Sequence, residues 1–393
     1  MNRSLETLNP FREINREFPL NSSIKKWKKG GGKVVGFCGG DIPEEILAAA
    51  GVLPCWLRGP YAEIPLESAN AYLYIYTCSY ARSILETALK KDYDFLDGVV
   101  SGPYCDGTRR LIDVWGKYVS PPVVHFLNTP HKFSSEAWDF YHQSILEFIS
   151  VLEKTFETRI TEETLRGAIG TYNLTRALFG RLYTFRKREK PPISGAEVME
   201  VYNASAVMPR EEFNVLLESL VDELESTERE VEGEIRLMLN GTILHNPDYV
   251  RGIEDMGGLI VADSLLNGAM SFVDMVREDP GMDPLKAIST YYLKKFPSPR
   301  MYPADIRYGR ITGLVEEYGV DGVITGVVRY CAPHIYDEPR LKKRLDAKGI
   351  PSLKLDLEYG MAATGQVKTR VQAFLEMIKE RKRARRGKTD EKS

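Results

Sequence analysis

The sequence predicts an α/β protein with two doubly wound parallel-sheet domains and a helical segment between them. Three observations support this fold class. Short β-branched runs alternate with helix-like stretches near both ends of the chain. The middle instead carries apolar residues at three- and four-residue spacing. Finally, the motif DGVVSG at residues 97–102 recurs in similar form as DGVITG at residues 321–326, which indicates equivalent strands in the two halves of the chain.

The predicted organisation follows these changes in pattern. It comprises a helical leader at 1–32, a first α/β domain at 33–133, a helical segment at 134–230, a second α/β domain at 231–378 and a charged tail at 379–393. The expected strands are 33–37, 71–77, 97–102 and 121–128 in the first domain, and 234–244, 257–264, 321–328 and 351–358 in the second. Asp41 and Pro43 open the first predicted helix of the sheet, with acidic residues in its first turn.

Composition limits the class of protein. The chain has 393 residues, more than one ordinary core accommodates, with 43% hydrophobic and 27% charged residues and a net charge of −2. We expect no nucleic-acid partner, because the only basic run, KERKRARRGK at 379–388, has no interleaved aromatic residues. We expect no membrane association, because the apolar runs are shorter than the roughly 20 residues of a spanning helix. No secretory h-region is present near the start, and an odd count of five cysteines favours a reducing, cytoplasmic location.

Three of the cysteines occupy similar places in the predicted fold. Cys78, Cys105 and Cys331 each follow a predicted strand at its C-terminal end, the edge at which open parallel sheets bind ligands. Thiolates gathered from both halves in a cleft would hold an iron–sulfur cluster or zinc. Cys38 and Cys55 lie beside apolar sequence and are expected to be packing residues.

The spacing leaves alternatives open. Structural zinc sites usually contain a Cys-x-x-Cys pair, which this chain lacks, and Cys331 with His334 forms only a C-x-x-H pair. Inert loop cysteines or a single nucleophilic cysteine would also fit the pattern. The run KGGGKVVG precedes a strand and lacks the Gly-Lys-Ser/Thr end of a phosphate loop, so ATP hydrolysis is expected to belong to a partner.

An ordered set of motifs resembles the 2-hydroxyacyl-CoA dehydratase / benzoyl-CoA reductase family. The motifs are FCGGDIPEEILAAAGVLPCWLRG, CSYARS, CDGTRR, MGGLIVADSL, FPSPRMY and RYCAPHIYDEPRLKKRLDAKGIPSLKLDLEYG, and the resemblance extends from Val34 to Met377. It implies two α/β domains and a [4Fe–4S] cluster held by Cys78, Cys105 and Cys331. It also implies a dimer, formed with a homologous subunit or with itself, and an ATP-dependent iron–sulfur activator protein that delivers single low-potential electrons.

The activity implied by the resemblance is that of a lyase or an oxidoreductase. The first option is 2-hydroxyacyl-CoA dehydration and the second is reduction of an aryl-CoA, both with a CoA thioester as substrate. A related alternative is a homodimeric reductase of small molecules with a shared [8Fe–9S] double-cubane cluster. An alternative of another class is an interaction protein with a purely structural metal site. Dehydratase-type subunits often carry a serine in the loop after the first strand, whereas this chain reads CGGD there, which leaves direct dehydration by this subunit less favoured.

Four further residues are candidates for the chemistry. His334 and Glu44 are expected to act in proton transfer, and Arg82 and Arg109 in binding the substrate. Each arginine lies four residues after a candidate ligand cysteine. A surface salt bridge for the arginines and a helix N-terminal role for Glu44 are the competing interpretations.

Overall fold

Two four-stranded parallel sheets form the framework of the protein. The computed structural model describes residues 5–390. The sheets have the strand orders β2-β1-β3-β4 and β6-β5-β7-β8, which confirms the predicted fold class. Their bounds are β1 Lys33–Cys38, β2 Val52–Trp56, β3 Gly98–Ser101, β4 Val123–Phe126, β5 Ile235–Gly241, β6 Gly258–Ser264, β7 Gly322–Val328 and β8 Ser352–Leu357.

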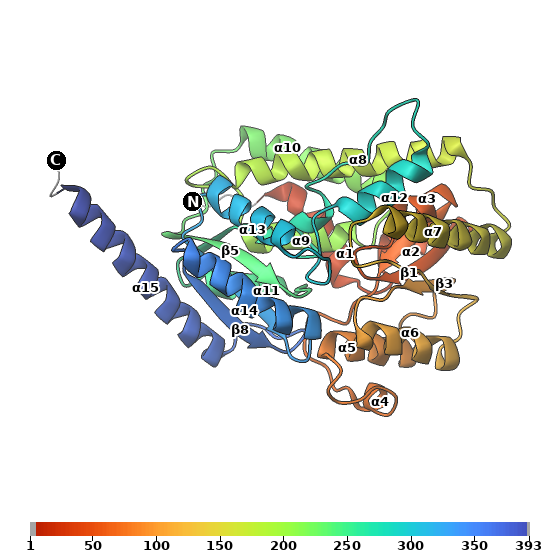
Figure 1. The fold of residues 1–393 in the computed structure, drawn as a ribbon, viewed down its shortest axis with the longest axis horizontal. Helices are drawn as coiled ribbons and strands as arrows, with labels where there is room; N and C mark the ends of the chain where they lie inside the picture. Colours follow the sequence, from red (N-terminus) through yellow and green to blue (C-terminus); the bar gives the residue numbers. More distant parts are fainter. Residues whose placement is uncertain (1–4, 391–393) are drawn as a thin grey trace.

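Helices surround both sheets (Figure 1). The helices that precede the first sheet or connect its strands are η1 Glu6–Leu8, α1 Asn9–Arg16, α2 Ser22–Lys29, α3 Glu44–Ala49, α4 Glu67–Asn70, α5 Ser79–Leu89 and α6 Asp106–Tyr118. The helical middle comprises α7 Ser135–Phe156, α8 Glu162–Phe185, α9 Gly195–Ser205 and α10 Arg210–Ser226. The second half adds α11 Pro247–Glu254, η2 Ala269–Ser271, α12 Pro284–Lys294, α13 Asp305–Glu317, α14 Ala332–Ala347 and α15 Gly365–Asp390.

The repeated Asp-Gly motif lies at the start of the equivalent strand in each sheet. β3 and β7 each stand third in strand order, beside the first strand of their own half. The Asp97 carboxylate accepts a 2.9 Å hydrogen bond from the Val34 backbone N–H, and Asp321 accepts one of 2.9 Å from Arg236. In both sheets the aspartate therefore satisfies the donor at the start of the neighbouring strand, so the repetition has a structural cause.

The predicted strand at 71–77 is wrong. These residues form turns, and the second strand of the first sheet is instead β2. Tyrosines favour strands, which explains the prediction, but Tyr74 and Tyr76 are exposed and pair with no strand. β2 contains Pro54, which can donate no ladder hydrogen bond, and the sheet accommodates it because β2 is an edge strand.

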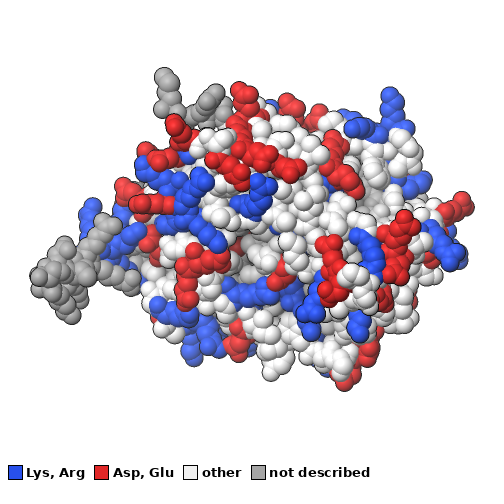
Figure 2. Space-filling model, turned by 90° about the horizontal axis from the view of Figure 1, so that it is seen from above, with Lys and Arg blue, Asp and Glu red and all other residues white. Residues whose placement is uncertain are grey.

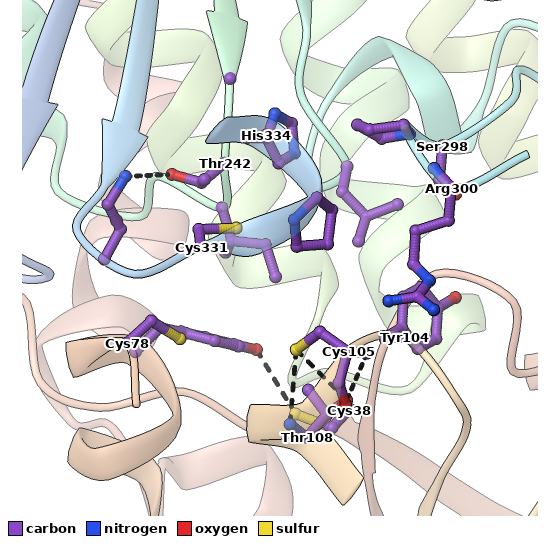
Figure 3. Close-up of a pocket in the computed structure, with 18 of the residues that line it drawn as sticks. Cys38, Cys78, Tyr104, Cys105, Thr108, Thr242, Ser298, Arg300, Cys331 and His334 are labelled. Atoms are coloured by element: carbon purple, nitrogen blue, oxygen red, sulfur yellow. Dashed lines mark hydrogen bonds between the residues drawn. The ribbon is translucent and has the colours of Figure 1, made fainter. Parts of the chain in front are cut away.

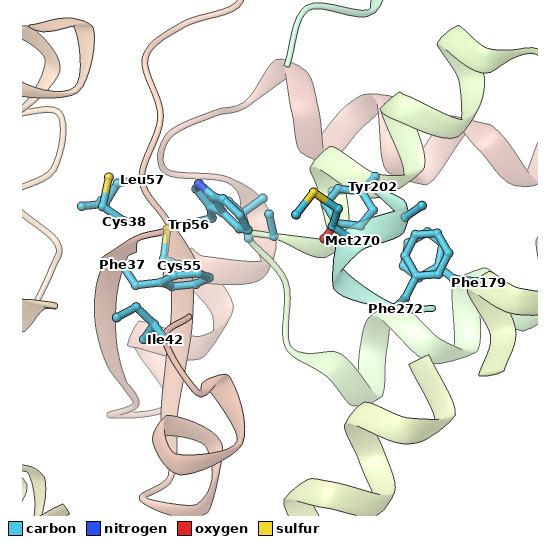
Figure 4. Close-up of a cluster of buried hydrophobic side chains, with 14 of the residues drawn as sticks. Phe37, Cys38, Ile42, Cys55, Trp56, Leu57, Phe179, Tyr202, Met270 and Phe272 are labelled. Atoms are coloured by element: carbon cyan, nitrogen blue, oxygen red, sulfur yellow. The ribbon is translucent and has the colours of Figure 1, made fainter. Parts of the chain in front are cut away.

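The helical middle joins the two halves through a shared core. α8 packs against α3 of the first half and α12 of the second. Figure 4 shows Phe37 and Trp56 from the first sheet on one side of this core, with Phe179 of α8 and Phe272 after β6 on the other. The Phe179 and Phe272 rings stack with centroids 4.8 Å apart. The two sheets are thereby held in one packed body.

A buried ion pair reinforces the contact between α3 and α8. The Arg176 guanidinium donates to the Glu45 carboxylate, and the Tyr292 hydroxyl donates to the other carboxylate oxygen at 2.7 Å. Burial alone would raise the pKa of Glu45, but Arg176 and Tyr292 bring that pKa below its ordinary value. Each charge compensates the other, so the pair orders this contact without leaving an unpaired ion inside.

The C-terminal helix lies at the periphery. α15 contacts α11, β5 and β8, and its end stands clear of the rest of the molecule (Figure 1). Much of the predicted charged tail is thus helical, while residues 391–393 lie outside the described part of the chain.

The surface carries charges of both signs. Lysine and arginine are interspersed with acidic residues on the face shown in Figure 2. Within residues 5–390, every helix is too short or too polar to cross a bilayer. The domain boundaries given above stay a prediction.

Candidate active site

The three candidate ligand cysteines stand at the N-termini of three helices. Cys78 is the N-cap of α5, Cys105 that of α6 and Cys331 that of α14. A helix N-terminus presents unpaired N–H groups and the positive end of the helix dipole, both of which favour an anionic thiolate. The sequence thus supplies each sulfur with a local environment that suits a metal ligand.

Cys105 shows this arrangement most directly. Its Sγ accepts from the backbone N–H of Thr108 at 3.4 Å, and the Thr108 hydroxyl accepts from the Cys105 N–H at 3.2 Å. This reciprocal capping box holds the thiol at the start of α6. Cys105 and Cys331 follow β3 and β7, as expected, whereas Cys78 follows the turns at 71–77 and not a strand.

The three thiols line one cavity between the two halves. The cavity measures about 90 Å³. Figure 3 shows Cys78 and Cys105 on the side of the first sheet, with Cys331 and His334 facing them from the second. Much of the remaining wall is apolar, including Leu266, Met270, Pro299 and Val328. The cavity is therefore a poorly hydrated space with thiols on two opposite walls.

Burial and the neighbouring thiols raise the pKa values of Cys78 and Cys331. Burial, and secondarily the neighbouring Cys105, raises the pKa of Cys78 to about 12. Burial raises the pKa of Cys331 well above its ordinary range, with a smaller contribution from Cys78. Without a cation, the buried thiols therefore stay protonated, and a positively charged iron centre would reverse this preference.

Three thiols are a donor set that an iron–sulfur cluster would take. All three cysteines are free thiols. Among the described residues, no group of three or more Cys, His, Asp or Glu side chains is placed so that it could hold one metal ion. In a cluster each thiolate binds a different iron, so the thiols need not converge on one point. Soft sulfur donors at three positively polarised helix ends are suited to such a group.

The structure also shows cavity residues that the sequence analysis did not single out. Cys38, expected to be a packing residue, is 1% exposed and belongs to the core, yet it also lines the cavity. Cys55 is buried and does not line it. Tyr104 lines the cavity beside Gly39, whose φ of 110° is in the left-handed region and whose missing Cβ makes room for the Tyr104 ring. A serine at Gly39 would meet this ring, which accounts for glycine in the CGGD loop.

Of the two candidates for proton transfer, His334 lines the cysteine cavity and Glu44 does not. His334 lines the cavity, and burial lowers its pKa to about 3, with Arg307 contributing. Its imidazole is therefore neutral at ordinary pH and could donate or accept a hydrogen bond without carrying charge. Glu44 does not line the cysteine cavity, and its carboxylate pairs with the Arg210 guanidinium at 2.7 Å.

The two candidate substrate-binding arginines also lie outside the cavity lining. Arg82 donates to the Thr77 carbonyl at 2.8 Å and to the Asn70 side chain at 2.9 Å, so it holds the loop that leads to Cys78. Arg109 is exposed, with its guanidinium 5.7 Å from the centre of the Phe126 ring. A role for either in binding substrate stays a prediction.

Comparison with known proteins places the chain in a family. The family model described as "2-hydroxyglutaryl-CoA dehydratase, D-component" matches residues 40–378. The beta subunit of (R)-phenyllactyl-CoA dehydratase from Clostridium sporogenes is 26% identical, over 96% of this chain and 100% of its own length. One of the subunits of benzoyl-CoA reductase from Thauera aromatica is 25% identical, over 91% of this chain and 94% of its own. The beta subunit of (R)-2-hydroxyglutaryl-CoA dehydratase from Acidaminococcus fermentans is 26% identical, over 90% and 95%.

These relatives are named as subunits of dehydratases and of a reductase that act on CoA thioesters, in agreement with the resemblance inferred from the motifs. The matched region contains every strand of both sheets except β1, together with all three helix-capping cysteines. The chain therefore belongs to the 2-hydroxyglutaryl-CoA dehydratase, D-component, family.

Proposed function

We propose that this chain is the iron–sulfur subunit of a CoA-thioester enzyme, either a 2-hydroxyacyl-CoA dehydratase or an aryl-CoA reductase. The observation that supports this most is the meeting of three helix-capping cysteines, from both halves of the chain, around one apolar cavity. Cys78, Cys105 and Cys331 would hold a [4Fe–4S] cluster.

When bound, the cluster would supply low-potential one-electron chemistry and an iron with no protein ligand. The protein's own contribution is to keep water out through the apolar wall and to stabilise the thiolates at helix N-termini. His334 supplies a neutral imidazole on the same wall as Cys331. Such a group can hydrogen-bond to a substrate oxygen without adding charge to the cavity.

The proposed partners follow from the relatives. Because these are named as subunits, we infer a second, related subunit or a second copy of this chain. An ATP-dependent iron–sulfur activator protein would deliver the electron. A double-cubane [8Fe–9S] cluster is the second candidate, because the motifs also resemble those of homodimeric double-cubane reductases. The two glycines after Cys38 do not provide the room for it, since the Tyr104 ring and Leu266 fill the space beside them.

Metal analysis of cysteine variants tests the proposal. Strictly anaerobic purification of the wild-type chain is expected to give about four irons and four acid-labile sulfides per chain, as one cubane contains. Cys78→Ala, Cys105→Ala and Cys331→Ala should each lose most of the iron. Cys55→Ala is the matched control, because it removes a buried thiol that is not part of the cavity lining.

Two results would contradict the proposal. One is zinc in place of iron, which would support a structural metal site. The other is a folded wild-type chain that takes up neither iron nor sulfide under anaerobic reconstitution. Thermal unfolding of each variant, followed by circular dichroism, separates loss of iron from loss of fold.

A further inference from the structure

A second cavity, with charged side chains in its wall, lies behind the cysteine cavity. It measures about 40 Å³, and residues of α3, α8, α9, α10 and α12 line it. Phe37 borders it on one side and Phe179 on the other (Figure 4). We call it the polar chamber, after the charged residues that line it: Glu44, Arg176, Arg210 and Lys295. Its volume and its polar groups suit ordered water. The proposed function as stated so far gives it no role.

The polar chamber shares a wall with the cysteine cavity. Gly39 and Met270 line the cysteine cavity. The residues that follow them in the chain, Gly40 and Ser271, line the chamber. Two stretches of backbone, one after β1 and one in η2, therefore separate the two cavities.

On its other side the chamber adjoins a surface groove. Residues of α8 and α13 line this groove, together with Val273 and Met275, which are 41% and 50% exposed. Arg176 and Phe272 line both the groove and the chamber. The groove, the chamber and the cysteine cavity thus follow one another from the surface inward.

Lys295 stands where the chamber meets the cysteine cavity. The residue is 7% exposed, and its ammonium group donates to the Gly40 carbonyl. Among the described residues, this carbonyl is the one acceptor bonded to the ammonium, and no carboxylate lies within ion-pair distance of it. An ammonium group has three N–H donors, so the others are available to water in the chamber.

Asp41 connects Lys295 to the cysteine cavity. Burial raises the pKa of the Asp41 carboxyl, and the Lys295 charge opposes this effect most. The Tyr104 hydroxyl also hydrogen-bonds to the Asp41 side chain, and Tyr104 lines the cysteine cavity (Figure 3). Lys295, Asp41 and Tyr104 therefore form a connected series of proton-carrying groups from the chamber to the cavity.

The surroundings of Lys295 make its proton easier to release. Burial lowers the pKa of Lys295, Asp41 opposes this effect, and Arg176 adds to it. Glu44 and Glu45 of α3 oppose it less than Asp41 does. The ammonium group therefore loses its proton more readily than that of an ordinary lysine.

Both candidate reactions need protons in a cavity whose wall is largely apolar. A hydroxyl group leaves as water only if it gains a proton, and the reduction of a ring adds one proton for each electron. We propose that the polar chamber is the proton entry of the enzyme. For each electron that arrives, the Lys295 ammonium passes one proton through Asp41 and Tyr104 to the substrate, and a proton from solvent restores the ammonium through the chamber. The inference rests on the proposed function, which supplies the electron.

Redox titration of the iron-loaded full chain, followed by electron paramagnetic resonance without substrate, tests this inference. The added negative charge should make Lys295 bind a proton more tightly, so that reduction is coupled to proton uptake. From about pH 7.5 to 10, the potential of the wild-type chain should fall by up to about 59 mV per pH unit, the one-electron equivalent of a tenfold change. Lys295→Arg keeps the charge but cannot release its proton, so its potential should not change with pH.

The controls separate this role from a structural one. Lys294→Met removes an exposed lysine next to Lys295 in the chain and should keep the wild-type slope. Lys295→Met should lose the slope as Lys295→Arg does, and it serves as the second variant if the larger arginine disturbs the fold. Circular dichroism reports the fold of each variant.

The opposing results are distinct. A wild-type potential that does not change with pH, or an equal slope in the wild-type chain and Lys295→Arg, overturns the inference but not the proposed function. Loss of iron in a folded Lys295→Arg also overturns it, because the lysine would then serve the cluster itself. If the wild-type chain takes up no iron, the inference and the proposed function both fail.

Discussion

Four of the five cysteines line one cavity, but their hydrogen bonds distinguish them. The Tyr80 hydroxyl donates to the Leu57 carbonyl at 2.8 Å, so its single proton is used there. Its oxygen accepts from Trp56 Nε1 at 3.1 Å, and the Cys38 Sγ lies 3.7 Å away. Cys38 must then be the donor in this contact and keep its proton. Burial raises the pKa of Cys38 to about 12, in agreement with a neutral thiol.

We therefore predict that Cys38→Ala retains the iron and sulfide of the wild-type chain. A thiol that acts as a hydrogen-bond donor in the core is not available as an anionic ligand. Iron and sulfide analysis after anaerobic reconstitution checks this, with Cys105→Ala measured alongside as the variant that loses iron. A loss in Cys38→Ala as large as that in Cys105→Ala would make Cys38 a fourth ligand.

Single residues also show where sequence reasoning succeeds. Cys105 and Cys331 could be placed from the sequence because parallel strands bring the loops at their carboxyl ends together. Arg300 and Tyr104 could not be assigned to the cavity in the same way. Arg300 reaches it because the 296–302 segment crosses to His131, and Tyr104 because Gly39 leaves room for its ring. Both are long-range contacts that leave no periodic signal in the chain.

The secondary-structure elements were largely predictable where their apolar pattern is strong. α8 and α10 have long stripes at helical spacing, and β7 is a continuous buried run, so their types are clear from the sequence. The error at 71–77 arises because local β propensity says nothing about whether a neighbouring strand is available for pairing. β2 was missed because Pro54 is a poor strand residue everywhere except at a sheet edge.

A contact between two helices gives a prediction about pH. Glu254 of α11 accepts from the backbone N–H groups of Gly195 at 2.7 Å and Ala196 at 3.2 Å, at the N-terminus of α9. Burial nevertheless raises the pKa of Glu254 from 4.5 to about 7. The folded chain then binds more protons than the unfolded chain between these values. The free energy of unfolding should therefore fall as pH rises from 4.5 to 7, by roughly 1–3 kcal/mol, and level off above that range.

Glu254→Gln isolates this contribution, because glutamine keeps the shape and does not ionise. Urea unfolding of both proteins at several pH values should show a smaller decline for the variant than for the wild-type chain. Parallel curves for the two proteins across the range would contradict the prediction. They would mean that the two backbone donors outweigh burial and keep the carboxylate ionised.

At the scale of the whole molecule, exposed aromatic side chains surround the loops that carry the cysteines. We call Tyr72, Tyr74, Tyr76, Tyr118 and Tyr330 the aromatic surface. Neighbouring rings are in contact, with centroids 4.4 Å apart for Tyr72 and Tyr118, 5.0 Å for Tyr74 and Tyr76, and 5.1 Å for Tyr76 and Tyr330. It spans both halves of the chain, and Tyr74 is 70% exposed. A patch of this kind is typical of a protein–protein interface.

We predict that the aromatic surface contacts the second subunit. Tyr74→Ser combined with Tyr76→Ser should weaken the assembly at least about tenfold, because exposed tyrosines are frequent binding hot spots. Sedimentation velocity over a concentration series measures the effect. Phe140→Ser removes an equally exposed aromatic ring from α7 and should leave the assembly unchanged. An unaltered mass distribution for the double variant would place the interface elsewhere.

The order of the cysteines along the chain also sets when the site can be assembled during synthesis. Cys78 and Cys105 leave the ribosome early, whereas Cys331 follows more than two hundred residues after Cys105. At roughly 5–20 residues per second, the first two thiols wait about 10–45 s for the third. A metal centre that needs all three thiols, and walls from both sheets, can form only after β7 and α14 have folded. Cluster insertion would then be a late, post-translational step, and incomplete chains would carry two unprotected thiols.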